Sequence, residues 1–273
     1  MHSQLCEQTA ASSLDREIDE ALTQLPKHGL ADLADSKLMN RVDNKFLFPV
    51  SHLPMVISSC KEQYSALEIE GVSKFHYRNL YFDTPDLNYY HRHHNRKLNR
   101  HKVRHRHYSD TGISYLEVKF KNNKGRTIKT REKVSDEPDH AVASNHSFLL
   151  EQGIKTPQTL KPTQLCTYDR ISFASELRGE RITLDLNVRF ANRNRIIDPE
   201  KGKTVEIPSF VIAELKQMKL ERQSPFFHLM RNMSVRSRNF SKYCIGISLT
   251  SNQPIKSNRF KSNITKLKRS IVE

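Results

Sequence analysis

The sequence has few features of a secreted or membrane-spanning protein. Its 273 residues include only four cysteines, Cys6, Cys60, Cys166 and Cys244, and no C-x-x-C pair. This favours a reduced, cytoplasmic compartment. The first twenty residues contain no apolar h-region, which argues against a signal peptide. No apolar run approaches the roughly 20 residues that a membrane helix needs, so we expect a soluble cytoplasmic protein without integral membrane association.

Internal repeats and Gly/Ser-rich linkers are also missing. One main domain is therefore favoured over two, and the length suits a large α+β or all-β domain. We expect an N-terminal helical extension over residues 1–36, the main domain over 37–248, and a basic C-terminal tail over 249–273.

Negative charge is scarce relative to positive charge. The formal net charge is +15 at pH 7 and the sequence pI is about 9.7. Such a balance predicts a polyanionic partner: nucleic acid, an anionic membrane or phosphate-rich small molecules.

Residues 101–131, HKVRHRHYSDTGISYLEVKFKNNKGRTIKTR, predict three strands. The turn signals SDTG and NNKG separate them, which predicts an antiparallel meander. Because strand side chains alternate between faces, Arg104 shares a face with Arg106, Glu117 with Lys119, and Lys129 with Arg131. Leu116, Val118 and Phe120 line the opposite face of the middle strand.

Three later segments, TYDRISF, RITLDLNVRF and FVIAELKQ, repeat this alternation of apolar and charged faces. An ordinary antiparallel sheet with one solvated face shows the same pattern. The alternative is a curled sheet whose charged face lines a cavity. The pattern alone favours the ordinary sheet. Lys and Arg near the middle of strands, and the pairs Glu117/Lys119 and Glu214/Lys216, argue for the second interpretation, and both stay open at this point. A hard cation prefers carboxylate oxygen, and phosphate oxygens prefer Lys and Arg.

Helices are predicted between and around these strands. The first, in SSLDREIDEALTQL, has Ser12 or Ser13 as its N-cap. Pro85 suits the first turn of a short helix, and Gly153 suits the end of another. The further helical segments are VSHLPMVISSCKEQY, HAVASNHSFLLEQG and PFFHLMRNMS. The polar, basic C-terminal segment is interpreted as a loose tail or a marginal helix.

Eight ordered motifs between about Leu38 and Ile247 carry a family resemblance: RVDNKF, YFDTPDL, NRHKVRHRHY, YLEVKFKNNKGRTIKTR, TYDRISF, RITLDLN, VIAELK and FSKYCIG. The chain resembles the VTC domain, the polyphosphate polymerase domain of the vacuolar transporter chaperone, within the triphosphate tunnel metalloenzymes. It is most similar to a stand-alone prokaryotic type. The resemblance implies an α+β fold: an antiparallel β-barrel with helices packed outside. Its charged faces would point into a tunnel that binds triphosphate or polyphosphate.

The resemblance also implies the site residues. The tunnel cations with catalytic and substrate-binding roles would be Lys45, Arg104, Arg106, Lys119, Lys129, Arg170, Arg181, Lys216 and Lys242. Further substrate contacts would come from Arg131, Tyr168 and Ser241. Glu214 occupies the family's metal-ligand position, and Glu117 is a second metal candidate. The implied cofactor is a divalent metal, Mn²⁺ or Mg²⁺.

The sequence departs from related branches in two ways. The adenylate cyclase and thiamine triphosphatase branch opens its first strand with E-x-E-x-K, where this chain has Arg41, Asp43 and Lys45. That branch is therefore disfavoured. The phosphate-sensing helical domain and membrane helices of the eukaryotic polymerase subunits have no counterpart here, which disfavours membrane-coupled translocation.

The implied activity is transfer of the γ-phosphoryl of ATP to a growing polyphosphate chain. An inorganic or nucleoside triphosphatase, and a non-catalytic polyphosphate binder, remain alternatives, and the oligomeric state is open. Specific nucleic-acid binding is disfavoured, because the predicted cationic faces carry few aromatic residues, Tyr115 and Tyr168 being exceptions. The histidines at 91, 93, 94, 101, 105 and 107 match no standard zinc spacing, which disfavours a metal cluster there.

Overall fold

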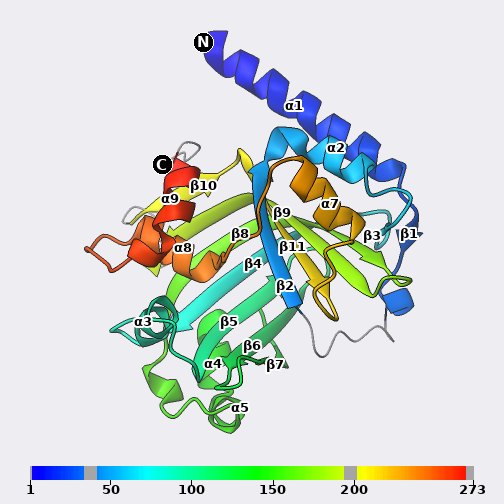
Figure 1. Ribbon diagram of the computed structural model, residues 1–273. Coiled ribbons are helices and arrows are strands. Elements are labelled where there is room, and N and C mark those ends of the chain that lie inside the picture. Colours follow the sequence, from blue (N-terminus) through cyan, green and yellow to red (C-terminus); the bar gives the residue numbers. More distant parts are fainter. Residues whose placement is uncertain (1, 34–41, 194–201, 269–273) are drawn as a thin grey trace. The chain divides into compact units, whose positions relative to one another are not determined.

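The computed structural model describes residues 2–33, 42–193 and 202–268. The chain forms two compact units. Unit 1 comprises residues 1–75, 170–186 and 209–239, and unit 2 comprises 76–169, 187–208 and 240–273. Two long strands, β8 (Lys161–Ser175) and β9 (Glu180–Asn192), continue from one unit into the other (Figure 1). The domain boundaries expected from the sequence stay a prediction.

Unit 1 is built on β11 (Phe210–Gln217), which pairs antiparallel with β2 (Val42–Pro49) on one side and with β9 on the other. The short strands β1 (Lys27–His28) and β3 (Ser65–Leu67) pair in parallel, and β3 also pairs with β8. The alternation in FVIAELKQ places Val211, Ala213 and Leu215 in the core.

Helices cover the apolar face of unit 1. They are α1 (His2–Thr23), α2 (Leu53–Ser58) and α7 (Pro225–Asn232), with the 3₁₀ turns η1 (Ala31–Leu33) and η2 (Val50–His52). Leu22, Val56 and Phe226 bring the three helices into one core with the strands. The predicted N-cap of α1 at Ser12 or Ser13 is wrong, because the helix already begins at His2. The upstream segment holds no Gly or Pro that would stop it there.

Unit 2 contains the meander expected from the sequence: β5 (Arg100–Tyr108), β6 (Ile113–Lys121) and β7 (Thr127–Val134). Both turns place glycine at positive φ, +64° at Gly112 and +74° at Gly125, where other residues would be strained. β4 (Lys74–Asp83) pairs with β5, and β10 (Thr204–Ile207) pairs with β9.

The helices of unit 2 are short. They are α3 (Asn88–His94), α4 (Pro138–Ala143), α5 (His146–Glu151), α8 (Lys242–Thr250) and α9 (Lys261–Leu267), with η3 (Pro157–Thr159) and η4 (Asn258–Phe260). Val142 and Leu149 pack on the apolar face of the meander. The single helix expected before Gly153 is two helices, α4 and α5. Pro85 precedes α3 instead of opening it. In the basic C-terminal segment Phe260 and Leu267 are buried, so its described part contains a packed helix.

The strands form an α+β fold with a large antiparallel sheet in the order β2-β11-β9-β8-β4-β5-β6-β7. Within the described residues this sheet is not closed, and β2 and β7 are its end strands, so the prediction of a barrel holds only in part. β7 exposes charged residues on both faces, including Arg131, Glu132 and Lys133. Charge of this kind on an edge strand disfavours further pairing. None of the described helices is long and apolar enough to cross a membrane.

Candidate functional site

The register of unit 2 places three lysines directly opposite one another across β5, β6 and β7. Lys102 faces Lys119, and Lys119 faces Lys129. We call these three residues the lysine row. Like charges at directly opposed positions of a sheet destabilise it unless something neutralises them. The sequence predicted Lys119 and Lys129 as site residues and missed Lys102, although counting back by two from Arg104 would have found it.

The next row holds a buried carboxylate between two arginines. Arg104 faces Glu117, and Glu117 faces Arg131. Glu117 is fully buried; Arg104 donates from Nε and Nη2 to its Oε2 at 2.7 and 2.5 Å, and Lys129 Nζ lies 2.5 Å from its Oε1. Burial raises the pKa of Glu117, but Arg104, Arg106 and Lys129 outweigh that effect and hold it well below its usual value. This arrangement favours a counter-ion role for Glu117 over metal ligation.

Arg106 lies in an enclosure of tyrosines. Its Nε donates to Asn79 Oδ1 at 2.8 Å, and its Nη2 donates to Tyr168 Oη at 3.0 Å. The guanidinium carbon is 5.2 Å from the ring centroid of Tyr77 and 5.8 Å from that of Tyr108, which is within cation–π range. With 6% of its surface exposed, Arg106 is held in a single orientation.

The N-terminus of α8 brings two further predicted residues beside this face. Ser241 is the N-cap and accepts from the backbone N–H of Cys244 at 3.3 Å. Its hydroxyl also accepts a 2.9 Å hydrogen bond from Lys102 Nζ. Lys242 Nζ lies 4.5 Å from the ring centroid of Tyr168. The structure therefore brings Tyr168, Ser241 and Lys242 together with the meander cations.

Lys129 differs from an ordinary surface lysine. Burial, together with the charge of Arg104, lowers its pKa to about 8, although the carboxylate of Glu117 acts in the opposite direction. Its charge therefore changes just above neutral pH, where most lysines are fully protonated.

In unit 1 the predicted residues gather around Glu214. Register pairs Glu214 with Lys45 on β2 and with Thr183 on β9. Lys45 Nζ lies 3.2 Å from Oε1 of Glu214, and Lys216 Nζ lies 2.9 Å from Oε2. We call Lys45, Glu214 and Lys216 the Glu214 cluster.

The electrostatics of the Glu214 cluster are asymmetric. The carboxylate of Glu214 raises the pKa of Lys45, while burial lowers the pKa of Lys216. Register places Arg181 opposite Lys216. Arg170, the remaining predicted cation of this unit, makes a bidentate pair with Asp185 at 2.5 and 2.8 Å.

The structure thus places the predicted residues in two groups, one in each unit. Arg41, on the expected first strand, lies outside the described residues. That all the cations point to one common axis stays a prediction.

A divalent metal would have to rely on Glu214. The described residues contain no group of three or more His, Cys, Asp or Glu side chains able to hold an ion. Glu214 retains 19% side-chain exposure, whereas Glu117 retains none. Mg²⁺ commonly takes one or two carboxylates and completes its shell with water and substrate phosphates, and a single carboxylate at Glu214 fits that mode.

The aromatic content of the cationic face was underestimated from the sequence. Cross-strand register puts Tyr77, Tyr81 and Tyr108 on this face in addition to the expected Tyr115 and Tyr168. Arg131 lies over the ring of Tyr115 at 4.4 Å. Tyr77, Tyr81 and Tyr168 are at most 8% exposed. These three rings contact the arginines and offer little surface on which bases could stack.

The histidine-rich segment has structural contacts. His101 Nε2 lies 3.1 Å from the carbonyl of Gln152, and His105 Nε2 lies 3.0 Å from that of Ser135. His107 Nδ1 contacts Ser114 Oγ at 2.9 Å. These contacts join β5 to neighbouring segments.

Comparison with known proteins identifies the family. A match to the VTC domain covers residues 40–251. The chain belongs to the VTC domain family. The matched region contains both the lysine row and the Glu214 cluster. No curated protein matches the chain.

Several solved structures resemble this VTC domain protein weakly. An adenylate cyclase candidate from Bacillus halodurans is 15% identical with a TM-score of 0.48, covering 74% of this chain and 94% of that one. An adenylyl cyclase candidate from Hippeastrum, described as having a dominant triphosphatase activity, is 13% identical with a TM-score of 0.48, covering 76% and 94%. A conserved hypothetical protein from Pyrococcus furiosus is 11% identical with a TM-score of 0.43, covering 75% and 99%.

Proposed function

We propose that this VTC domain protein is a polyphosphate polymerase that transfers the γ-phosphoryl of ATP to a growing polyphosphate chain. The lysine row is the observation that carries the proposal. Two unit charges 4 Å apart repel by about 4 kcal/mol at an effective dielectric of 20. A phosphate chain carries negative charge at regular intervals and would add such charge along the whole row, where Glu117 pairs with Lys129.

The residues of unit 2 would hold and orient the phosphate chain. Arg106 is fixed by Asn79 and Tyr168, so it can fix a phosphate group in turn without losing much side-chain entropy. Lys119 and Lys129 would stabilise the charge that spreads over the transferred phosphoryl group. Ser241 and Lys242, at the N-terminus of α8, would contribute a hydroxyl and an ammonium.

Glu214 would hold a divalent cation, Mn²⁺ or Mg²⁺, with Lys45 and Lys216 on either side. The metal would supply Lewis-acid neutralisation of phosphate oxygens. The Glu214 carboxylate taken by itself would repel a phosphate chain, and a bound metal would remove that repulsion. The proposed chemistry needs no protein nucleophile, because the terminal phosphate of the chain attacks and ADP leaves.

Purified protein incubated with ATP and Mn²⁺, and in parallel with Mg²⁺, tests the proposal. Polyphosphate is measured on a gel and free phosphate in the same reaction. We expect chains that lengthen with time. Free phosphate without chains would mean that water is the acceptor and the protein is a triphosphatase. Neither product, with tight triphosphate binding, would mean a non-catalytic polyphosphate binder.

A further inference from the structure

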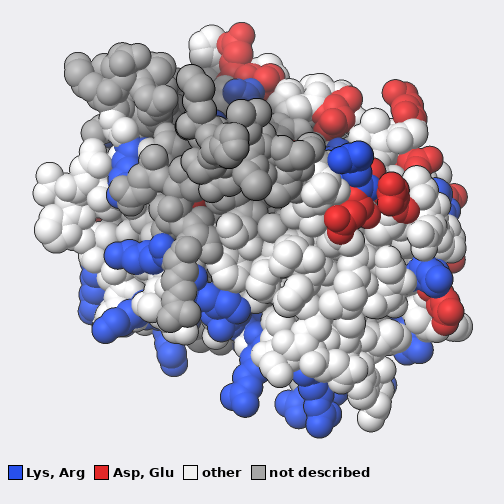
Figure 2. Space-filling view, turned by 90° about the horizontal axis from the view of Figure 1, so that it is seen from above, with Lys and Arg blue, Asp and Glu red and all other residues white. Residues whose placement is uncertain are grey.

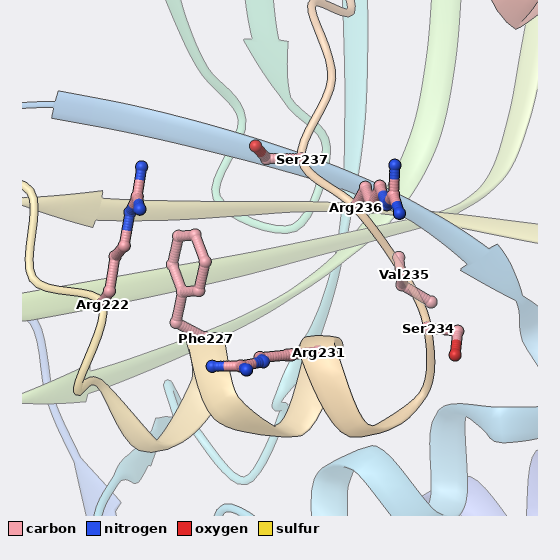
Figure 3. A pocket seen from close by; sticks show the side chains of 7 residues that line it. All are labelled: Arg222, Phe227, Arg231, Ser234, Val235, Arg236 and Ser237. Carbon is pink, nitrogen blue, oxygen red and sulfur yellow. The ribbon is translucent and has the colours of Figure 1, made fainter.

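Unit 1 contains a cavity that none of the predicted site residues lines. Its volume is about 850 Å³, and it lies around α7 and the segments that flank this helix (Figure 3). Seven residues line it, and we call it the arginine pocket: Arg222, Phe227, Arg231, Ser234, Val235, Arg236 and Ser237.

The arginine pocket lies on the helix-covered side of the strands. Phe227 and Val235 pack against the apolar core of unit 1, and the ring of Phe227 contacts Phe46 edge-on at 5.5 Å. Phe46 and Lys45 are adjacent on β2 and therefore point to opposite faces. The pocket is consequently separate from the Glu214 cluster.

Three arginines surround the pocket without a matching carboxylate. Figure 3 shows them coming from three places: Arg222 from the segment before α7, Arg231 from the helix, and Arg236 from the segment after it. No ion pair joins any of the three to a carboxylate within the described ranges.

Other cations of the same unit do have such partners. Lys27 pairs with Glu68 at 3.3 Å, and Lys74 pairs with Asp15 at 3.7 Å. Three like charges lie around one cavity, and none of its described lining residues is acidic. They leave an excess of positive potential that an anion would neutralise.

The backbone that carries the far wall of the pocket is anchored. Ser234 and Val235 donate to the carbonyls of Arg231 and Met230 at 2.9 and 2.8 Å, closing the end of α7. Two residues beyond Arg236, the N–H of Arg238 donates to the carbonyl of Lys45 at 2.8 Å. The segment from Ser234 to Arg238 is therefore tied at both ends, which holds this wall of the pocket in place.

We infer that the arginine pocket is a second binding site for a triphosphate group. Guanidinium groups bind phosphate oxygens bidentately, and the hydroxyls of Ser234 and Ser237 can donate to the same oxygens. The group can belong to a free inorganic phosphate chain or to a nucleotide, whose base would then meet the ring of Phe227. This inference stands on the pocket alone and does not depend on the proposed polymerase activity.

A tryptophan reporter tests the site directly, because the chain has none of its own. Asn232→Trp places one at the exposed C-terminal end of α7, beside the pocket, and replaces none of the seven lining residues. Its fluorescence is titrated with tripolyphosphate and with ATP at fixed ionic strength, without metal. We expect a saturable change with tripolyphosphate. Tighter binding of ATP would identify a nucleotide as the source, and equal or weaker binding a free phosphate chain. A titration that never saturates with either ligand would overturn the inference.

Charge-matched variants separate the pocket from general electrostatic attraction. In the reporter background, R222Q/R231Q/R236Q should weaken binding about tenfold or more, since charge-assisted hydrogen bonds are lost. K61Q/R178Q/K219Q removes the same number of positive charges elsewhere in unit 1. It should leave affinity within about twofold, because salt screens the effect of net charge on binding. Equal losses in both variants, or no loss in the first, would overturn the inference.

Circular dichroism verifies that the variants fold. If the triple variant unfolds, the single variants R222Q, R231Q and R236Q replace it, and each is expected to weaken binding.

Discussion

Glu117 and Glu214 show how burial separates two carboxylates that have the same kind of neighbours. Each lies between two cations: Arg104 and Lys129 in one case, Lys45 and Lys216 in the other. Glu117 has no exposed side-chain surface, so its negative charge interacts with Arg104 and Lys129 and is not accessible to a ligand. Glu214 keeps enough exposure to reach a ligand, and only it combines that exposure with a predicted metal role.

Glu214→Gln should therefore remove catalysis and spare anion binding. The substitution keeps the shape of the side chain and removes the charge that would hold a metal. We expect polyphosphate synthesis or triphosphate hydrolysis to fall by about two orders of magnitude or more, the scale of losing a main electrostatic element. Binding of metal-free tripolyphosphate, measured by calorimetry, should be retained or tighten. Glu68→Gln is the matched control, because Glu68 is a half-buried carboxylate that also pairs with a lysine, Lys27. Full activity of Glu214→Gln with Mn²⁺ would place the metal elsewhere and leave Glu214 as an ion-pair partner of its lysines.

Lys129 should make triphosphate binding sensitive to pH. With a pKa lowered to about 8, it is largely charged at pH 7 and largely neutral at pH 9. We expect affinity measured by calorimetry to fall between these two values, because a phosphate contact is lost. Lys129→Arg stays charged throughout and should flatten the profile. An equal decline in both proteins would assign the titration to another group.

The same shift predicts a stability effect without ligand. The unfolded chain holds the Lys129 proton up to about 10.4, the ordinary lysine pKa, and the folded chain releases it near 8. The unfolded state binds more protons between these values, so this residue's contribution to the free energy of unfolding rises with pH across that window. In urea titrations wild type should gain more than Lys129→Arg over this range.

At the scale of the elements, the position of α8 depends on a buried polar contact. Tyr243, next to Lys242, donates from its hydroxyl to Asp83, a fully buried carboxylate. Asp83 also accepts from the backbone N–H groups of Tyr89 and Tyr90 at 2.9 Å each, at the start of α3. Asp83 thereby joins α3 to the N-terminus of α8, which carries Ser241 and Lys242. Burial raises the pKa of Asp83, and the hydrogen bonds from Tyr243 and these N–H groups oppose that shift.

Tyr243→Phe should weaken both unit 2 and its ligand binding. A buried acceptor left without its donor costs about 1–3 kcal/mol of unfolding free energy, and the released α8 terminus should lower triphosphate affinity. Tyr64→Phe is a chemically matched control, since Tyr64 donates to the buried Glu180 at 2.5 Å in unit 1. It should lose similar stability in urea titrations without affecting phosphate binding to the lysine row. Loss of affinity in neither variant would mean that α8 does not contribute to the phosphate site.

At the scale of the whole molecule, the excess of positive charge is the dominant property. The net charge of +15 comes from 45 Lys and Arg against 30 Asp and Glu. On the face shown in Figure 2, Lys and Arg side chains gather at the left and lower edges without carboxylates among them, whereas at the upper right the two signs lie side by side. A polyanion therefore meets regions of concentrated positive potential.

Tripolyphosphate should raise the melting temperature of the full chain strongly. A ligand that binds only the folded state stabilises by about 2.7 kcal/mol at a hundred times its dissociation constant. Single-stranded DNA at the same phosphate concentration should stabilise less, because Tyr77, Tyr81 and Tyr168 are too buried to stack bases. Added salt should weaken the tripolyphosphate effect less than it weakens DNA binding, since partly buried charges are screened less. Equal stabilisation by both ligands in thermal melts would favour an exposed nucleic-acid surface.

The sequence by itself determined the local pattern of this protein. Alternation along FVIAELKQ separated Leu215 from Glu214 and Lys216, and SDTG and NNKG located both turns of the meander, because these signals act between near neighbours. It could not show that Lys102 reaches Ser241, or that Asp83 joins α3 to α8, since these partners lie more than a hundred residues apart. The convergence of Arg222, Arg231 and Arg236 likewise depends on how the chain turns after α7. The open ends of the sheet at β2 and β7 were decided by tertiary structure too: strand alternation is the same in an open sheet and a closed barrel, and only the pairing of distant strands distinguishes the two.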